Sequence, residues 1–138
     1  MIGLVSCQKI ETGQNVDAET IQLVKSLRLL DLDERIVLYY SNFEKNKAGS
    51  FLTNKRIAHY WLDKQPDKNR LESAYYQNIV SITPKYNVPD FDCPYIEITG
   101  KDGTRFRAYM EGSSEEKKLF FEQAVALWII SRPVDIVR

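Results

Sequence analysis

The sequence predicts a mainly β domain of seven short strands, forming a barrel or sandwich that a C-terminal helix caps and an additional helix precedes. Three observations lead to this fold class. From residue 35 onward, apolar residues recur with a period of two. Residues 49–60 read as a hairpin, in which Asn54 is expected to supply the positive φ of a tight turn. After residue 113 the apolar period becomes helical. A chain of 138 residues suffices for one domain with one core.

The first helix is predicted over residues 17–30. Asp17 can cap it, and Val16 can pack back onto Ile21. One helical stripe contains Thr20, Leu23, Val24, Leu27 and Leu30. Because short isolated helices are marginal in water, we expect this helix to dock against the barrel or another subunit. No structure is predicted for residues 2–16.

The seven strands are predicted over residues 35–41, 49–53, 56–62, 70–76, 79–86, 95–99 and 104–110. In the last hairpin, a three-residue loop pairs Ile98 with Phe106 and Glu97 with Arg107, which keeps the apolar side chains on one face. Such a loop needs a left-handed residue at its end, and Gly103 meets this need.

The last helix is predicted over residues 114–131. Ser113 and Glu116 have the spacing of a capping box, and Pro133 ends the helix. The chain then divides into an N-terminal extension, a barrel with its capping helix and a tail, at residues 1–31, 32–132 and 133–138.

The string Leu-Thr-Asn-Lys-Arg-Ile at residues 52–57 resembles the hairpin of bacterial pleckstrin-homology (PH) domains and of the related GRAM family. Trp128 is similar to the tryptophan that marks the C-terminal helix of many PH domains. The resemblance covers residues 32–132. It implies a PH-like barrel of two antiparallel sheets, plugged at one end by the last helix. The N-terminal helix lies outside the pattern.

Composition restricts the classes of partner. Apolar residues make up 43% of the chain and charged residues 28%, as in soluble globular proteins. The 19 basic residues equal the 19 acidic ones, so the basic surplus that favours nucleic acid is missing. No apolar run reaches the ~18 residues of a membrane span.

Few residues suggest catalysis, and we expect neither enzymatic activity nor a bound metal or cofactor. His59 lies mid-strand and reads as structural, because nothing in the sequence places a substrate or nucleophile beside it. Cys93 lies in a loop, and a Cys93–His59 dyad is the enzymatic alternative. The acidic residues in 31–34 lack the spacing and glycine of a calcium loop and read as a connector.

The resemblance points to basic residues at the open end of the barrel, where PH domains bind phosphoinositides. The loops that follow the first, third and sixth strands hold Lys45, Lys47, Lys64, Lys68, Arg70 and Lys101. Four acidic residues in the same loops reduce the net charge to +2. Each basic residue contributes ~1 kcal/mol near an anionic surface, so a net charge of +2 is not enough to hold a protein on a membrane alone. Peripheral membrane binding through these loops is therefore the alternative function.

The leading expectation is a non-enzymatic module for protein contact or self-association. Tyr39, Tyr60 and Tyr75 fall on strand positions, and tyrosine is enriched at interfaces. They are expected interface residues, together with Leu23 and Leu27 of the first helix. Tyrosine is also common in sheets for packing reasons alone, which is the competing explanation.

The two cysteines, Cys7 and Cys93, have no ligand spacing and fit reduced thiols in the cytoplasm. Residues 4–7, Leu-Val-Ser-Cys, have the small-residue pattern that precedes a lipidated cysteine. A lipid anchor at Cys7 is the alternative localisation if the true start lies upstream.

Overall fold

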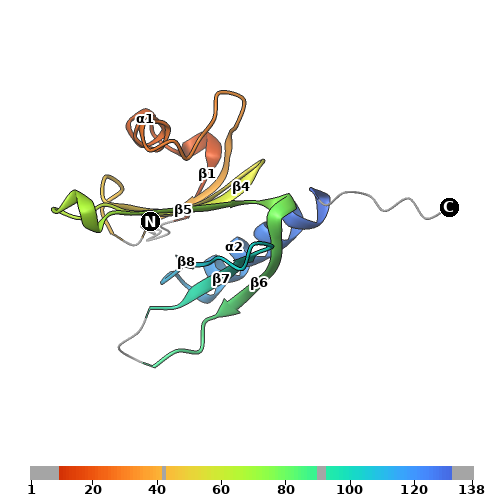
Figure 1. Cartoon of the computed structure of the whole chain (residues 1–138). Coiled ribbons are helices and arrows are strands. Elements are labelled where there is room, and N and C mark those ends of the chain that lie inside the picture. Colours follow the sequence, from red (N-terminus) through yellow and green to blue (C-terminus); the bar gives the residue numbers. More distant parts are fainter. Residues whose placement is uncertain (1–9, 42, 90–92, 132–138) are drawn as a thin grey trace, which may run out of the picture.

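The computed structural model describes residues 10–41, 43–89 and 93–131 and contains two antiparallel sheets (Figure 1). Sheet A has five strands in sequence order: β1 (Ile10–Thr12), β2 (Ile36–Tyr40), β3 (Ala48–Thr53), β4 (Arg56–Trp61) and β5 (Arg70–Tyr75). Sheet B follows with β6 (Ile79–Lys85), β7 (Tyr95–Gly100) and β8 (Arg105–Tyr109).

The helix α2 (Ser114–Ile130) packs against β6 and against η3 (Tyr76–Asn78), the corner that joins the two sheets. The Trp128 indole N–H donates to the Ile79 carbonyl at 3.1 Å. Strands β2 to β8 together with α2 confirm the predicted PH-like architecture. The predicted capping box of Ser113 and Glu116 is also present.

The hairpin between β7 and β8 has the predicted register. Ile98 lies opposite Phe106, and Glu97 lies opposite Arg107. Gly103 has a φ of 87°, the left-handed conformation that this loop requires.

The turn between β3 and β4 differs from the prediction in its backbone. Arg28 is the one described non-glycine residue with positive φ, so the positive φ expected of Asn54 is wrong. The Asn54 side chain instead accepts a hydrogen bond from the Arg35 backbone N–H at 2.8 Å. The Thr53 hydroxyl accepts from the backbone N–H groups of Lys55 and Arg56, each at 2.9 Å. Side chains therefore close this turn and tie it to the start of β2.

An eighth strand, β1, was not predicted. It pairs antiparallel with β2, and the Ile10 backbone N–H donates to the Glu116 carboxylate of α2 at 3.0 Å. Three residues are too few to show an alternating pattern. The contact with Glu116 joins residues far apart in the sequence, so no local signal could reveal it.

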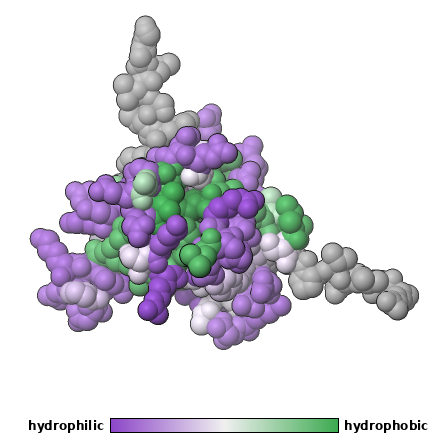
Figure 2. Space-filling view, turned by 90° about the horizontal axis from the view of Figure 1, so that it is seen from above, coloured by the Kyte–Doolittle hydropathy of each residue, from purple (hydrophilic) through white to green (hydrophobic). Residues whose placement is uncertain are grey.

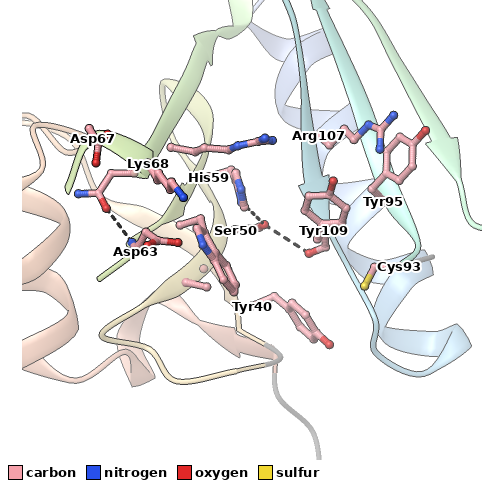
Figure 3. Close-up of a pocket in the computed structure, with 15 residues that line it drawn as sticks. Tyr40, Ser50, His59, Asp63, Asp67, Lys68, Cys93, Tyr95, Arg107 and Tyr109 are labelled. Atoms are coloured by element: carbon pink, nitrogen blue, oxygen red, sulfur yellow. Dashed lines mark hydrogen bonds between the residues drawn. The ribbon is translucent and has the colours of Figure 1, made fainter. Parts of the chain in front are cut away.

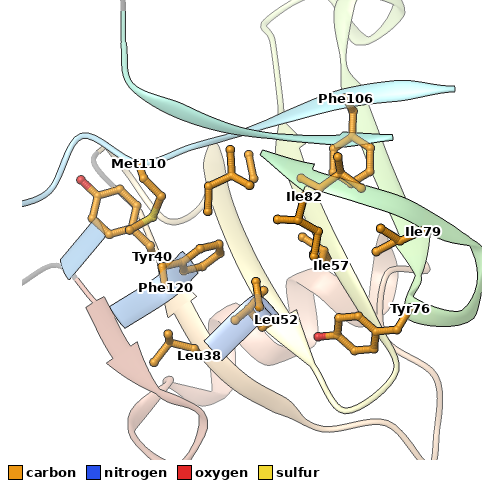
Figure 4. Close-up of a cluster of buried hydrophobic side chains, with 14 residues drawn as sticks. Leu38, Tyr40, Leu52, Ile57, Tyr76, Ile79, Ile82, Phe106, Met110 and Phe120 are labelled. Carbon is orange, nitrogen blue, oxygen red and sulfur yellow. The ribbon is translucent and has the colours of Figure 1, made fainter. Parts of the chain in front are cut away.

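The main core fills the space between the sheets and α2 (Figure 4). Sheet A contributes Leu38, Leu52 and Ile57 from its inner face. Sheet B contributes Ile82 and Phe106, and α2 adds further side chains, among them Phe120 and Ala124. The apolar residues whose period of two predicted the strands are therefore the residues that point to this inner face.

A second core lies on the outer face of sheet A, beneath α1 (Ala18–Ser26), as Figure 1 shows. Val24 of α1 and Leu29 and Leu30 after it pack with outward-facing side chains of the sheet, among them Phe51 and Ala58. Figure 2 views the molecule from the side of α1 and shows apolar side chains gathered in the middle of this face. The predicted docking of the N-terminal helix onto the barrel is confirmed.

α1 begins as predicted, because Asp17 accepts from the Thr20 backbone N–H at 2.7 Å. It ends at Ser26, four residues earlier than predicted. Arg28 takes a φ of 62°, and its N–H and that of Leu29 donate back into the last turn at 3.0 Å each. This Schellman motif normally has glycine at the left-handed position, so no residue of the sequence indicated it.

Replacing Leu27 with aspartate is expected to lower the free energy of unfolding by about 2 kcal/mol, because the carboxylate would lie against the second core. Urea unfolding measures the change. Gln22→Asp, at an exposed position of the same helix, is the control and should alter stability far less. Equal effects of the two substitutions would contradict the docking of α1 through this face.

Candidate functional site

A cleft of about 770 Å³ opens between sheet A and the last strand of sheet B (Figure 3). One wall is the inner face of sheet A at the start of β3 and the end of β4, together with the loop that leads into β5. The other wall consists of Tyr95 on β7, Arg107 and Tyr109 on β8, and Cys93 before β7.

Along β3 and β4, the inner face of sheet A passes from core residues to residues that line the cleft. On β4, Ile57 belongs to the main core, whereas His59 and Trp61, which share its face, line the cleft. On β3, Leu52 lies in the core and Ser50 lines the cleft. The cleft is therefore the part of this face that sheet B does not cover with apolar side chains.

The only histidine, His59, is buried and contacts Ser50. Its Nδ1 lies 3.3 Å from the Ser50 hydroxyl oxygen, which also donates to the Tyr109 carbonyl at 3.3 Å. Burial and the nearby charge of Arg70 lower the pKa of His59 to about 4. A neutral imidazole of such low basicity is a weak general base at neutral pH, and Ser50 is itself only 2% exposed. The pair joins β3 and β4 to β8.

The two members of the alternative dyad, His59 and Cys93, both line the cleft. Figure 3 places them on opposite walls. The His59 ring packs edge-on against the ring of Tyr109, with ring centroids 5.8 Å apart. The contacts of His59 include Ser50, Tyr109 and the Gly49 backbone, which fits a structural role.

Aromatic side chains lie on both walls. The rings of Tyr95 and Tyr109 meet edge-on at 5.8 Å, and the Arg107 guanidinium lies 4.4 Å from the Tyr95 ring centroid. On the facing wall, Trp61 stacks on Phe43 at 6.0 Å. These last two side chains are 42% and 54% exposed, so they form an accessible aromatic pair beside the cleft.

Two of the basic residues predicted for the open end are in ion pairs. Lys45 contacts Glu11 at 2.7 Å and Asp17 at 3.6 Å. Lys47 lies 3.9 Å from Glu44. The first two pairs tie the β2–β3 loop to the N-terminal extension, so Lys45 has a structural explanation that the sequence did not suggest.

The remaining predicted basic residues do not form one cluster. Lys68 and Arg70 line the cleft, whereas Lys64 does not. Lys101 lies in the β7–β8 turn beside η3, where its backbone N–H donates to the Asn78 carbonyl at 2.7 Å. Arg107, which the sequence assigned only to an exposed pair with Glu97, lines the cleft instead.

The expected interface tyrosines occupy different environments. Tyr39 and Tyr60 are fully buried in the second core, with their hydroxyl oxygens 2.6 Å apart, so their expected place on the surface is wrong. α1 covers the sheet face that carries them. Tyr75 is half-buried, with the Arg56 guanidinium 4.9 Å from its ring centroid. Leu23 and Leu27 are half-buried against the second core.

Within residues 10–41, 43–89 and 93–131, no three histidine, cysteine, aspartate or glutamate residues are grouped as a metal site. None of the helices formed by these residues could span a membrane. Cys7 and the tail at 133–138 lie outside the described residues.

No family model matches the chain, and no curated protein matches it. Among solved structures, the chain is similar to the 2.00 Å crystal structure of a DUF1696 family protein with a pleckstrin-homology domain from Shewanella loihica PV-4. The two are 14% identical, with a TM-score of 0.48, and the match covers 78% of this chain and 92% of the other. The PH-like architecture of this protein is defined by its own strand order and by the position of α2.

Proposed function

We propose that the protein is a non-enzymatic binding module that holds an acidic, aromatic-containing segment of a partner protein in the cleft. The observation that supports this most is the lining of the cleft. Aromatic rings lie on both walls, and cationic side chains lie beside them.

The charge of the cleft favours an anionic ligand. Lys68, Arg70 and Arg107 take part in none of the ion pairs found among the described residues. Asp63 and Asp67 also line the cleft, which leaves a net charge of +1. A carboxylate of the ligand would accept charge-assisted hydrogen bonds from these cations.

The shape and the aromatic side chains favour a peptide segment. The volume falls within the range of about 300–1,000 Å³ that is common for ligand sites. Trp61, Tyr95 and Tyr109 offer rigid contact area with polar groups at the ring edge, the combination found at protein interfaces. Stacking on these rings would accept an aromatic side chain of the partner.

The same groups give little support to turnover. His59 is neutral at pH 7, because its pKa is lowered to about 4, and its contact Ser50 is buried. Neither feature is that of an activated nucleophile and its base. Binding explains the cationic and aromatic lining without a chemical step.

A random copolymer of glutamate and tyrosine is a suitable probe, and tryptophan fluorescence is the readout, since Trp61 lines the cleft. We expect saturable, salt-sensitive binding that Arg107→Glu weakens at least about tenfold, because a repulsive charge replaces an attractive one. Lys101→Glu is the matched control. It makes the same charge change on the exposed turn beside η3 and should bind as the wild type does.

The membrane alternative gains one observation from the structure, the exposed stack of Phe43 on Trp61. Sedimentation with phosphatidylserine vesicles is therefore run in parallel. Binding to vesicles without binding to the copolymer would replace the protein partner with a membrane surface. Equal loss of copolymer binding in Arg107→Glu and Lys101→Glu would show that only net charge matters and would overturn the cleft as the site.

A further inference from the structure

Strand β5 is an edge strand of sheet A. In the part of the chain that the structure describes, its ladder runs to β4 alone, without a register shift. The Tyr76 N–H donates to the Lys55 carbonyl, which fixes the phase of this antiparallel ladder. Alternation then directs the backbone N–H and C=O groups of Leu71, Ser73 and Tyr75 away from β4.

This edge lacks most of the features that prevent strands from pairing. It contains no proline and no bulge, and Leu71 on the outer face is 45% exposed. The exception is a pair of charges, Arg70 and Glu72, which are two residues apart and therefore share the inner face. A single inward-facing charge would oppose pairing between two copies. Two opposite charges at this spacing can instead each face the oppositely charged residue of the other copy.

We propose that two copies of this chain associate through their β5 edges, antiparallel about a two-fold axis at Leu71. In this register each Arg70 lies directly opposite Glu72 of the partner subunit. Leu71 lies opposite its own counterpart on the outer face. The Arg–Glu pairs occupy non-hydrogen-bonded positions, where facing Cα atoms are about 4.5 Å apart and side chains are closest.

The charges select this register from its neighbours. Matching faces require an axis through a residue of the strand. An axis at Glu72 would place this residue against its own counterpart, and facing like charges destabilise a sheet. An axis at Ser73 would leave Arg70 and Glu72 facing Tyr76 and Ala74, which carry no charge. The axis at Leu71 pairs every charge of the edge with its opposite.

The environment of Glu72 agrees with this arrangement. Burial raises the pKa of Glu72, and the nearby charge of Arg70 offsets this only in part. The carboxylate is thus incompletely compensated within one copy. A guanidinium from a second copy would add the missing hydrogen bonds.

Sedimentation velocity from low to high micromolar concentration tests the proposal. The wild type should dimerise with increasing concentration. Arg70→Glu and Glu72→Arg should each weaken the dimer at least about tenfold, since each substitution creates two like-charge contacts across the axis. The double variant Arg70→Glu/Glu72→Arg should restore dimerisation. Arg105→Glu, an exposed charge reversal on β8, is the control and should dimerise as the wild type does.

Ser73→Pro adds a test that is independent of charge. It removes an N–H that points away from β4, so the ladder within the chain is kept while the edge loses a donor. It also removes the Ser73 hydroxyl, which accepts from Arg56 at 3.5 Å, so the stability of this variant is measured alongside its association. Circular dichroism verifies the fold of each variant. A wild type that stays monomeric throughout, or a double variant that fails to recover, would overturn the proposal. Arg107→Glu should dimerise normally, which separates this edge from the cleft.

Discussion

Arg56→Ala is expected to lower the free energy of unfolding by about 3–5 kcal/mol, because it leaves a buried carboxylate without its cation. The side chains of Arg56 and Glu34 are 5% and 0% exposed and lie 2.8 Å apart. The Thr53 hydroxyl donates to the same carboxylate. Urea unfolding at neutral pH measures the loss. Lys55→Ala is the control, since its ion pair with Asp33 is exposed and should matter little.

This ion pair also sets a pH dependence. Burial alone would raise the pKa of Glu34, but hydrogen bonds from Arg56, Thr53 and the Asp31 backbone outweigh it and lower the pKa below its ordinary value of 4.5. The contribution of Glu34 to stability is therefore complete above pH 4.5 and is lost as the pH falls through the lowered pKa. Unfolding free energies measured below that pH should fall less steeply in Glu34→Gln. Identical slopes for the variant and the wild type would contradict this role.

Gly13→Ala is the second substitution with a large expected effect. A Cβ atom at this position would lie 1.7 Å from the backbone carbonyl oxygen of Ile36. Because the obstacle is backbone, no rotamer change relieves it, and the segment around β1 must move away from β2. We expect a loss of about 3 kcal/mol in the free energy of unfolding. Hydrogen exchange should show the amides of β1 opening first.

Gln14→Ala provides the control, because this exposed neighbour lies in the same short helical turn. It should leave both unfolding and exchange close to those of the wild type. If Gly13→Ala behaves like Gln14→Ala, the N-terminal segment is not held against β2 as described.

The sequence predicted those elements whose signals are local. The strands of the barrel alternate apolar and polar residues, and α2 begins at a recognisable capping box. β1 was missed because it is three residues long and is held by β2 and by Glu116, more than a hundred residues away in the chain. The end of α1 was misplaced because Arg28 occupies a position where glycine is usual.

The site was less predictable than the fold. The cleft has Trp61 of β4 on one wall and Arg107 and Tyr109 of β8 on the other, and no spacing in the sequence links these residues. The basic residues that the resemblance indicated do not form one site. Lys45, for example, pairs with Glu11, which lies in a segment for which no structure was predicted. The sequence could indicate charge in each loop, but only the structure shows which charges are already paired.

The two tryptophans allow the most direct test of binding in the cleft. Trp61 lines it, whereas the Trp128 indole donates to Ile79 at the junction of α2 with the barrel. We expect NMR titration with the glutamate–tyrosine copolymer to shift the indole signal of Trp61 and the side-chain Nε–H signal of Arg107, while the Trp128 indole signal stays in place. Shifts at Trp128 with none at Trp61 would contradict the cleft as the binding site.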